Sequence, residues 1–134
     1  MNYSKRQIEL LCSALRGDKT AFSTLAVEVP ELTALENALR GEKAPMEWLI
    51  KNNKILAAFV DASEGNGSAV KLLLSKKAFE LAAVANLLNE DENAMEWLKK
   101  RGLFYYIKLA ESIKYAWEKR SGSDLEGMFR PFGG

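Results

Sequence analysis

Apolar positions along this chain recur with a period of 24 or 25 residues. One series of five-residue segments begins at Ala21, Pro45, Ala69 and Ala94, in steps of 24, 24 and 25. A second series begins at Ile8, Leu32, Leu56, Leu81 and Tyr106, in steps of 24, 24, 25 and 25. Because two series keep one register, the pattern indicates a tandem repeat of one supersecondary unit.

Within both series the apolar residues follow a helical spacing. Met46, Leu49 and Ile50 stand three and four residues apart in the first series, as Leu81, Val84 and Leu88 do in the second. Sustained apolar–polar alternation, which would predict strands, does not occur. We call the first helix of each unit the A helix and the second the B helix. The predicted helices span 4–16, 20–28, 31–40, 45–52, 54–63, 68–76, 78–89, 93–101 and 103–120.

Residues at the helix ends support these boundaries. Ser4 and Gln7 have the spacing of a capping box. Pro30 and Pro45 fit the first helical position, where a missing N–H has no intrahelical acceptor to lose. A left-handed residue that stops a helix is expected just past four predicted ends, at Gly17, Gly41, Gly65 and Gly102.

Helices of about ten residues cannot bury an apolar face alone, so neighbouring pairs must stack. The prediction is an all-α fold, a short α-solenoid of stacked antiparallel helix pairs with about nine helices. Its helical-repeat domain covers 1–120, followed by a C-terminal linker and apolar tail at 121–134. Trp48 and Trp97 hold equivalent repeat positions, and we expect both to be largely buried between units.

The architecture resembles HEAT-like and ankyrin-like helical repeats, with a shorter period and without the ankyrin β-turn. The stretches 46–53 and 56–59 resemble tandem-repeat proteins of unassigned function in bacteria. The resemblance covers residues 8–113 and implies a fold and a class of protein, and it implies no activity.

Composition removes several kinds of chemistry. The chain has 134 residues, a net charge of +1, one cysteine (Cys12) and no histidine. Zinc sites built from Cys and His, and nucleophiles activated by imidazole, are excluded. We therefore predict no catalytic residues, no metal and no cofactor. The near-neutral charge gives no reason to expect nucleic acid as a partner.

The chain shows no targeting signal and no membrane span. Gln7 and Glu9 interrupt the apolar stretch near the N-terminus, and no apolar run approaches about 18 residues. We predict a cytoplasmic protein that does not bind membranes.

Polar residues recur at two neighbouring positions of the B helices. If B helices line a concave surface, as in many solenoids, these columns could recognise a protein or peptide. Small neighbours (Ala57, Ala82 and Ala85) would let the partner approach closely. Alternatively, the columns are solvent positions, or their amides bond between units. The first column is Asn37, Asp61, Asn86 and Glu111, and the second is Arg40, Glu64, Asn89 and Lys114.

Cations gather near the ends of the predicted A helices. Their attraction to the negative end of the helix dipole explains this placement, at about 0.3–1 kcal/mol each. Binding of a phosphate-rich ligand is the alternative. We call this set the basic rim: Lys51, Lys54, Lys76, Lys77, Lys99, Lys100 and Arg101.

The C-terminal segment breaks the repeat. Four apolar residues follow a linker-like stretch at 121–124, namely Leu125, Met128, Phe129 and Phe132. They could cap the last unit, dock into another molecule, or remain unfolded. We favour capping, because the last B helix has no following unit to cover it. Otherwise the C-terminal helix or tail would support self-association.

These features favour a non-catalytic adaptor or scaffold that binds a protein or peptide partner through its B-helix face. The alternative is an inhibitor or immunity-type protein that neutralises an enzyme or toxin by stoichiometric binding. A protein of either kind is not an enzyme.

Overall fold

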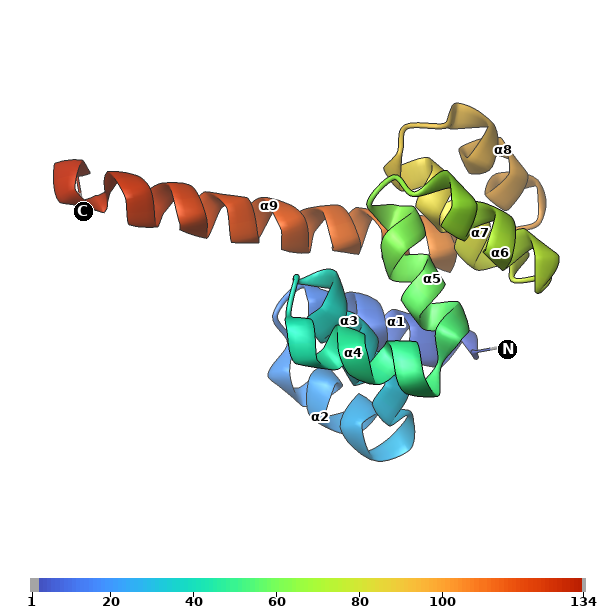
Figure 1. The fold of residues 1–134 in the computed structure, drawn as a ribbon, viewed down its shortest axis with the longest axis horizontal. Helices are drawn as coiled ribbons and strands as arrows, with labels where there is room; N and C mark the ends of the chain where they lie inside the picture. Colours follow the sequence, from blue (N-terminus) through green and yellow to red (C-terminus); the bar gives the residue numbers. More distant parts are fainter. Residues whose placement is uncertain (1–2, 134) are drawn as a thin grey trace.

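The computed structural model of the chain describes the backbone of residues 3–133 and the side chains of residues 3–119. Every element in this part is an α-helix, which confirms the predicted all-α fold (Figure 1). The helices are α1 (Lys5–Leu15), α2 (Lys19–Glu28), α3 (Pro30–Leu39), α4 (Lys43–Asn52), α5 (Lys54–Ser63), α6 (Gly67–Ser75), α7 (Phe79–Leu88), α8 (Glu92–Lys100) and α9 (Phe104–Gly133).

The helix ends follow the repeat. Ser4 and Gln7 form the predicted capping box. Each of the four predicted glycines has a positive φ, and the residue equivalent to Gly65 in the next unit, Glu90, also has a φ of 67°. Pro45 departs from the prediction: it is the third residue of α4, whose first residue is Lys43. It is tolerated there because the N–H groups of a first helical turn have no intrahelical acceptor.

The helices form two layers. The odd-numbered B helices make an inner layer, in which α1, α3, α5, α7 and α9 contact one another in that order. Each even-numbered A helix packs on the B helices before and after it, as α6 does on α5 and α7. This order of contacts is the stacking that the repeat predicts.

The inner layer closes on itself, because α9 also packs along α1. Arg16 Nε at the end of α1 donates to Ser112 Oγ of α9 over 3.1 Å. Trp117 Nε1 of α9 donates to the backbone carbonyl of Leu39 over 2.8 Å and so connects α9 to the end of α3. The first and last B helices are thus neighbours, although about a hundred residues separate them in the sequence.

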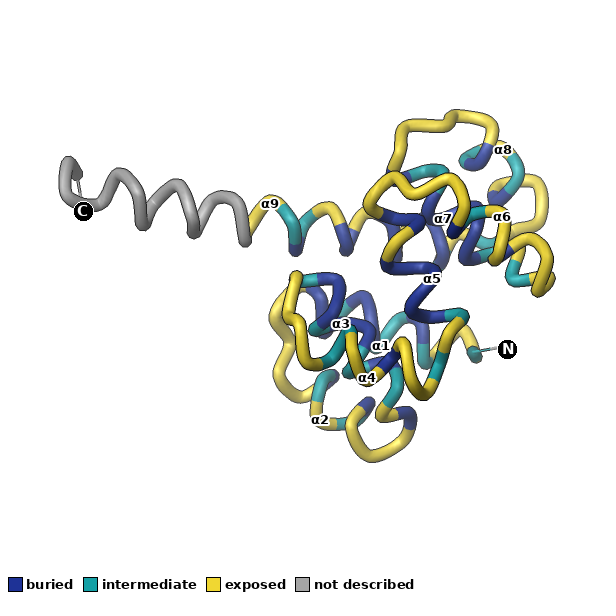
Figure 2. Tube along the Cα trace, viewed as in Figure 1, coloured by how far each residue is buried: buried dark blue, intermediate teal, exposed yellow. Residues whose placement is uncertain are grey.

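Closure turns the inward positions of the B helices into one core. Leu11, Leu35, Phe59, Val84 and Ile113, one from each B helix, are all buried in it. In Figure 2 the buried residues follow the B helices, while most of the A-helix surface is exposed. Among residues 3–119, the inward side of the B helices is therefore packed core and forms no open concave surface.

The A helices bury much less. Within each of them the buried residues number only one or two, such as Leu49 in α4 and Leu98 in α8. Trp48 is 45% exposed and Trp97 is partly buried, so the prediction that both are largely buried is wrong for Trp48. The adjacent leucines, Leu49 and Leu98, take the inward-facing position, and the Trp48 indole is left at the surface.

Helix α9 runs to Gly133, past its predicted end at residue 120 and through the segment 121–124 that we expected to be a linker. The side chains of Leu125, Met128, Phe129 and Phe132 lie outside the described residues. Capping by the tail, and self-association through it, therefore stay predictions.

Candidate protein-binding grooves on the outer layer

The A helices stand apart from one another. Among the described residues, every substantial helix–helix contact involves at least one B helix. Closure of the inner layer explains this, because helices packed outside a ring follow a longer path than those within it. Part of the outward surface of a B helix is therefore accessible to solvent between two successive A helices.

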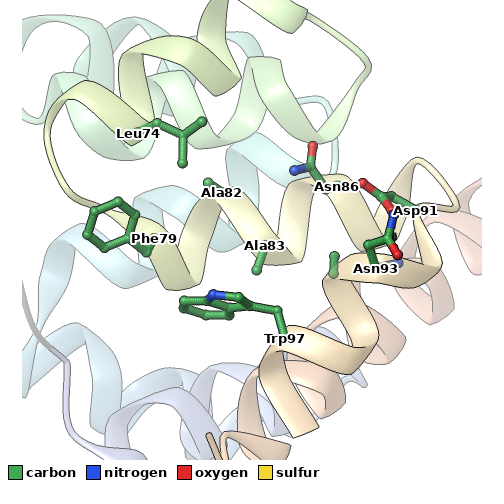
Figure 3. Close-up of a pocket in the computed structure, with 9 residues that line it drawn as sticks. Leu74, Phe79, Ala82, Ala83, Asn86, Asp91, Asn93 and Trp97 are labelled. Carbon is green, nitrogen blue, oxygen red and sulfur yellow. Dashed lines mark hydrogen bonds between the residues drawn. The ribbon is translucent and has the colours of Figure 1, made fainter. Parts of the chain in front are cut away.

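One groove lies over α7, between α6 and α8 (Figure 3). Ala82 and Ala83 form its floor, and Leu74, Phe79 and Trp97 stand around the floor at one end. The other end is polar and holds Asn86, Asp91 and Asn93. The groove has a volume of about 230 Å³.

A second groove, of about 340 Å³, lies over α5 between α4 and α6. All nine of its lining residues are the repeat equivalents of the nine that line the first, 24 or 25 positions earlier. Leu72, for example, replaces Trp97, and Lys54 replaces Phe79. Two successive repeat units thus build one shape from different side chains. Its lining consists of Ile50, Lys54, Ala57, Ala58, Asp61, Asn66, Ser68, Ala69 and Leu72.

Exposed apolar side chains concentrate beside these grooves. Seven large apolar residues are exposed among the described side chains, and four of them line a groove: Ile50, Leu72, Leu74 and Phe79. Burying such groups stabilises a complex, so a contiguous set marks an interaction surface more often than scattered ones do. The sequence carried a signal for this surface, since Leu72, Leu73 and Leu74 are consecutive and an amphipathic helix buries only one of them.

Trp97 forms a fixed wall of the groove over α7. The Arg101 guanidinium lies over the indole, with Cζ 4.0 Å from the ring centroid, and Arg101 Nη1 donates to the Trp97 carbonyl over 3.4 Å. The cation–π contact holds one face of the ring. In Figure 3 the ring lies beside Ala83 and Phe79. An aromatic wall held in this way loses little side-chain entropy when a ligand arrives.

The first predicted column is divided by the fold. Asp61 and Asn86 lie in the two grooves at equivalent places. With its amide nitrogen turned toward them, Asn37 donates to Glu36 Oε2 over 2.8 Å and to Glu42 Oε2 over 3.2 Å. Glu111 is exposed on α9. Only the two middle members of the column therefore belong to the candidate site.

In the second column, Arg40 and Asn89 connect successive B helices. Arg40 Nη2 donates to the carbonyls of Ala14 and Leu15 in α1, over 3.3 and 3.0 Å. Asn89 Nδ2 likewise donates to the Ala62 carbonyl in α5 over 3.1 Å. These carbonyls lie in the last turns of their helices, where no N–H four residues further on is available within the helix. The Ala14 and Ala62 carbonyls also accept from the N–H groups of Gly17 and Gly65. The alternative that amides of these columns bond between units therefore describes Asn89, and Arg40 makes the same kind of connection through its guanidinium.

The other two members of that column make no such bond between units among the described residues. Glu64 is exposed, and its carboxylate cannot donate to a carbonyl. Lys114 is also exposed and lines a hollow beside the acidic start of α8. Arg40 and Asn37 line the equivalent hollow beside α2. Since these hollows lack exposed large apolar side chains, we place the candidate site in the two grooves.

Arg40 also holds the one buried carboxylate among the described side chains. Its Nε lies 2.6 Å from Glu36 Oε1. Burial raises the pKa of the Glu36 carboxyl above its usual value, and the hydrogen bond from Arg40 opposes that shift. This pair belongs to the packing of α1 against α3.

The described residues show no group of three His, Cys, Asp or Glu side chains that could hold a metal ion. In the same part of the chain, no helix is long and apolar enough to cross a membrane. Comparison with models of known protein families, with curated proteins and with solved structures found no significant match. The candidate site therefore rests on its geometry.

Proposed function

We propose that this chain is a non-catalytic protein-interaction module, an adaptor or scaffold, that holds a partner in the grooves over α5 and α7. The observation that carries the proposal is that the same nine repeat positions form a groove twice, one on each side of α6. A surface built by repetition of a unit suits an extended partner, as in other repeat proteins.

The lining chemistry supports a protein partner. Small floors at Ala57 and Ala82 let a partner's side chain come close, and aliphatic or aromatic walls bury it. Each groove has room for a few apolar side chains, at or below the lower end of the roughly 300–1,000 Å³ of small-molecule pockets. Anchors of this kind carry most of the binding energy in protein interfaces.

The polar ends of the grooves would orient the partner. Asp61 and Asn86 lie at equivalent places, so both grooves present an acceptor on the same side. The proposed surface differs in one respect from the B-helix face that the sequence predicts. The proposed surface joins the outward side of two B helices to the A helices that flank them.

One double variant and one single control variant test the proposal. Leu72→Ser with Leu74→Ser removes an apolar wall from each groove, at positions that are already exposed. Val27→Ser is the matched control, because Val27 is 85% exposed on α2 and lines neither groove. Affinity capture from the native host, read by mass spectrometry, should recover a stoichiometric partner with the wild type and the control. The double variant should recover it at least tenfold less.

Both variants should melt within a few degrees of the wild type, since exposed positions contribute little to stability. A double variant that is folded and retains the partner would refute the proposed site. Cytoplasmic location and bacterial origin also stay predictions, and cell fractionation tests the first.

A further inference from the structure

The grooves have one strongly charged edge. Lys54 lines the groove over α5, and Lys76 and Lys77 lie between Leu74 and Phe79 in the chain. Arg101 stacks on Trp97. The basic rim therefore adjoins the apolar end of both grooves. All its members are exposed, and none forms an ion pair with a residue whose side chain the structure describes.

The helix dipole accounts for Lys51, Lys99 and Lys100, which lie in the last turns of α4 and α8. It does not account for Lys54, the first residue of α5, or for the apolar side chains beside these cations. A dipole interaction needs only the charge near the last turn. It gives no reason for Leu72, Leu74 and Phe79 to remain in water next to it. An apolar groove flanked by uncompensated cations is complementary to a ligand that carries apolar groups flanked by anions.

The polar end of each groove does not favour an anion, because its side chains either carry a negative charge or already accept hydrogen bonds. Asp91 Oδ1 accepts from the backbone N–H of Asn93, and Asn66 Oδ1 accepts from those of Ser68 and Ala69. Glu90 and Glu92 stand beside Asp91. In both grooves, therefore, the cations lie at the apolar end and not at the polar end. This arrangement determines which side of a partner carries the carboxylates.

The backbone of the grooves favours a helical partner. An extended segment would place unpaired N–H and C=O groups on the alanine floor, at a cost for each group left unbonded. The walls are helices whose own backbone groups are already paired, so they offer no strand edge. A helix satisfies its backbone internally and presents apolar residues at i, i+3 and i+4.

We infer that the occupant of these grooves is an acidic amphipathic α-helix of a partner protein. This inference rests on the proposed function and adds the partner's chemistry to it. Its apolar stripe lies in the grooves over α5 and α7, and its carboxylates lie toward the basic rim. Nucleic acid is a poorer match: the groove over α5 has only aliphatic walls, at Ile50 and Leu72, and offers no ring on which a base could stack. The carboxylates of Asp61 and Asp91 at the other ends of the two grooves would repel phosphates.

The test uses a phage-displayed library of helical 18-residue peptides with randomised exposed positions, selected on the full chain. The inference predicts that enriched peptides have a net negative charge and an apolar i, i+3/i+4 stripe. Binding of the enriched peptides should fall at least tenfold with Leu72→Ser/Leu74→Ser. It should also fall at least tenfold with Lys76→Glu/Lys77→Glu at about 0.05 M salt, and much less at about 0.5 M, where exposed charges are screened.

Lys5→Glu/Lys19→Glu is the charge-matched control, since both lysines are exposed and line neither groove. It should leave the affinity within twofold. Neutral or basic peptides that still need Leu72 and Leu74 would overturn the acidic helix and leave the proposed function standing. If no enriched peptide depends on the grooves, the proposed function itself fails. Tighter binding of a 20-nucleotide oligo-dT than of any peptide would overturn both the acidic helix and the proposed function.

Discussion

The A and B helices are similar in length and alternate in the chain, yet they differ sharply in how they are buried. The B helices α1, α3, α5 and α7 bury five to seven residues each. The A helices bury one or two. The comparison shows that one repeat unit contains a structural helix and a surface helix.

This division follows from closure of the ring. A B helix has other B helices on both sides and the core beneath it, so little of its surface meets water. An A helix rests on two B helices and touches no other A helix closely. The outer layer can therefore vary its exposed side chains at small cost in stability, and the grooves lie in that layer.

The largest expected effect comes from a substitution in the core of the inner layer. Phe59→Ala in α5 should reduce the free energy of unfolding by about 3–5 kcal/mol, because Phe59 is fully buried and its removal leaves a cavity. Trp48→Ala in the neighbouring A helix should cost less than about 1 kcal/mol, since much of the indole is already in water. Urea denaturation of both variants measures the difference. Equal losses would contradict the division into two layers.

A smaller effect should come from the bonds between B helices. Arg40→Ala leaves the Glu36 carboxylate buried without its partner and removes two bonds to α1. We expect a loss of about 2–3 kcal/mol, below the full cost of breaking a buried ion pair because Arg40 is partly exposed.

The control for Arg40 adds Glu36→Gln to the same variant. An amide needs no compensating charge, so the double variant should unfold at a higher urea concentration than Arg40→Ala alone. If the second substitution restores nothing, the uncompensated charge is not the cause. Loss of the bonds to α1 would then account for the whole effect.

The smallest expected effect comes from a position at which two successive repeats differ, Gly65 and Glu90. Glu90 holds the left-handed conformation that Gly65 holds one unit earlier. Left-handed backbone costs a non-glycine residue about 1–2 kcal/mol, and glycine gives back part of this in entropy. Glu90→Gly should therefore raise the free energy of unfolding by about 0.5–1 kcal/mol. Gly65→Ala is the reverse control and should lower the melting temperature.

Much of the fold could be predicted from the period alone. The register located all nine helices of residues 3–133, and the glycines at Gly17 and Gly41 marked helix ends correctly. Closure could not be predicted, because it depends on a small rotation between units that no single position encodes. The burial of Trp48 was misjudged because Leu49 beside it fits the same helical period.

The candidate site was predictable in part. Asp61 and Asn86 were found by their repeat positions, and both line a groove. Arg40 and Asn89 looked the same in the sequence, since a polar residue facing a ligand and one bonding a neighbouring helix share one spacing. The apolar walls at Leu72 and Leu74 were missed because an apolar residue on a helix is normally assigned to the core.

Closure of the inner layer is the central claim, and one engineered disulfide tests it directly. Cys12 is the chain's single cysteine; burial raises the pKa of its thiol, and the Ser112 hydroxyl beside it opposes that shift. Under mild oxidation, Ser112→Cys should form an intramolecular bond between α1 and α9. Mass spectrometry of the intact monomer would show the loss of two hydrogens, and the melting temperature would rise. Two free thiols, or a disulfide-linked dimer, would show that the first and last B helices do not meet.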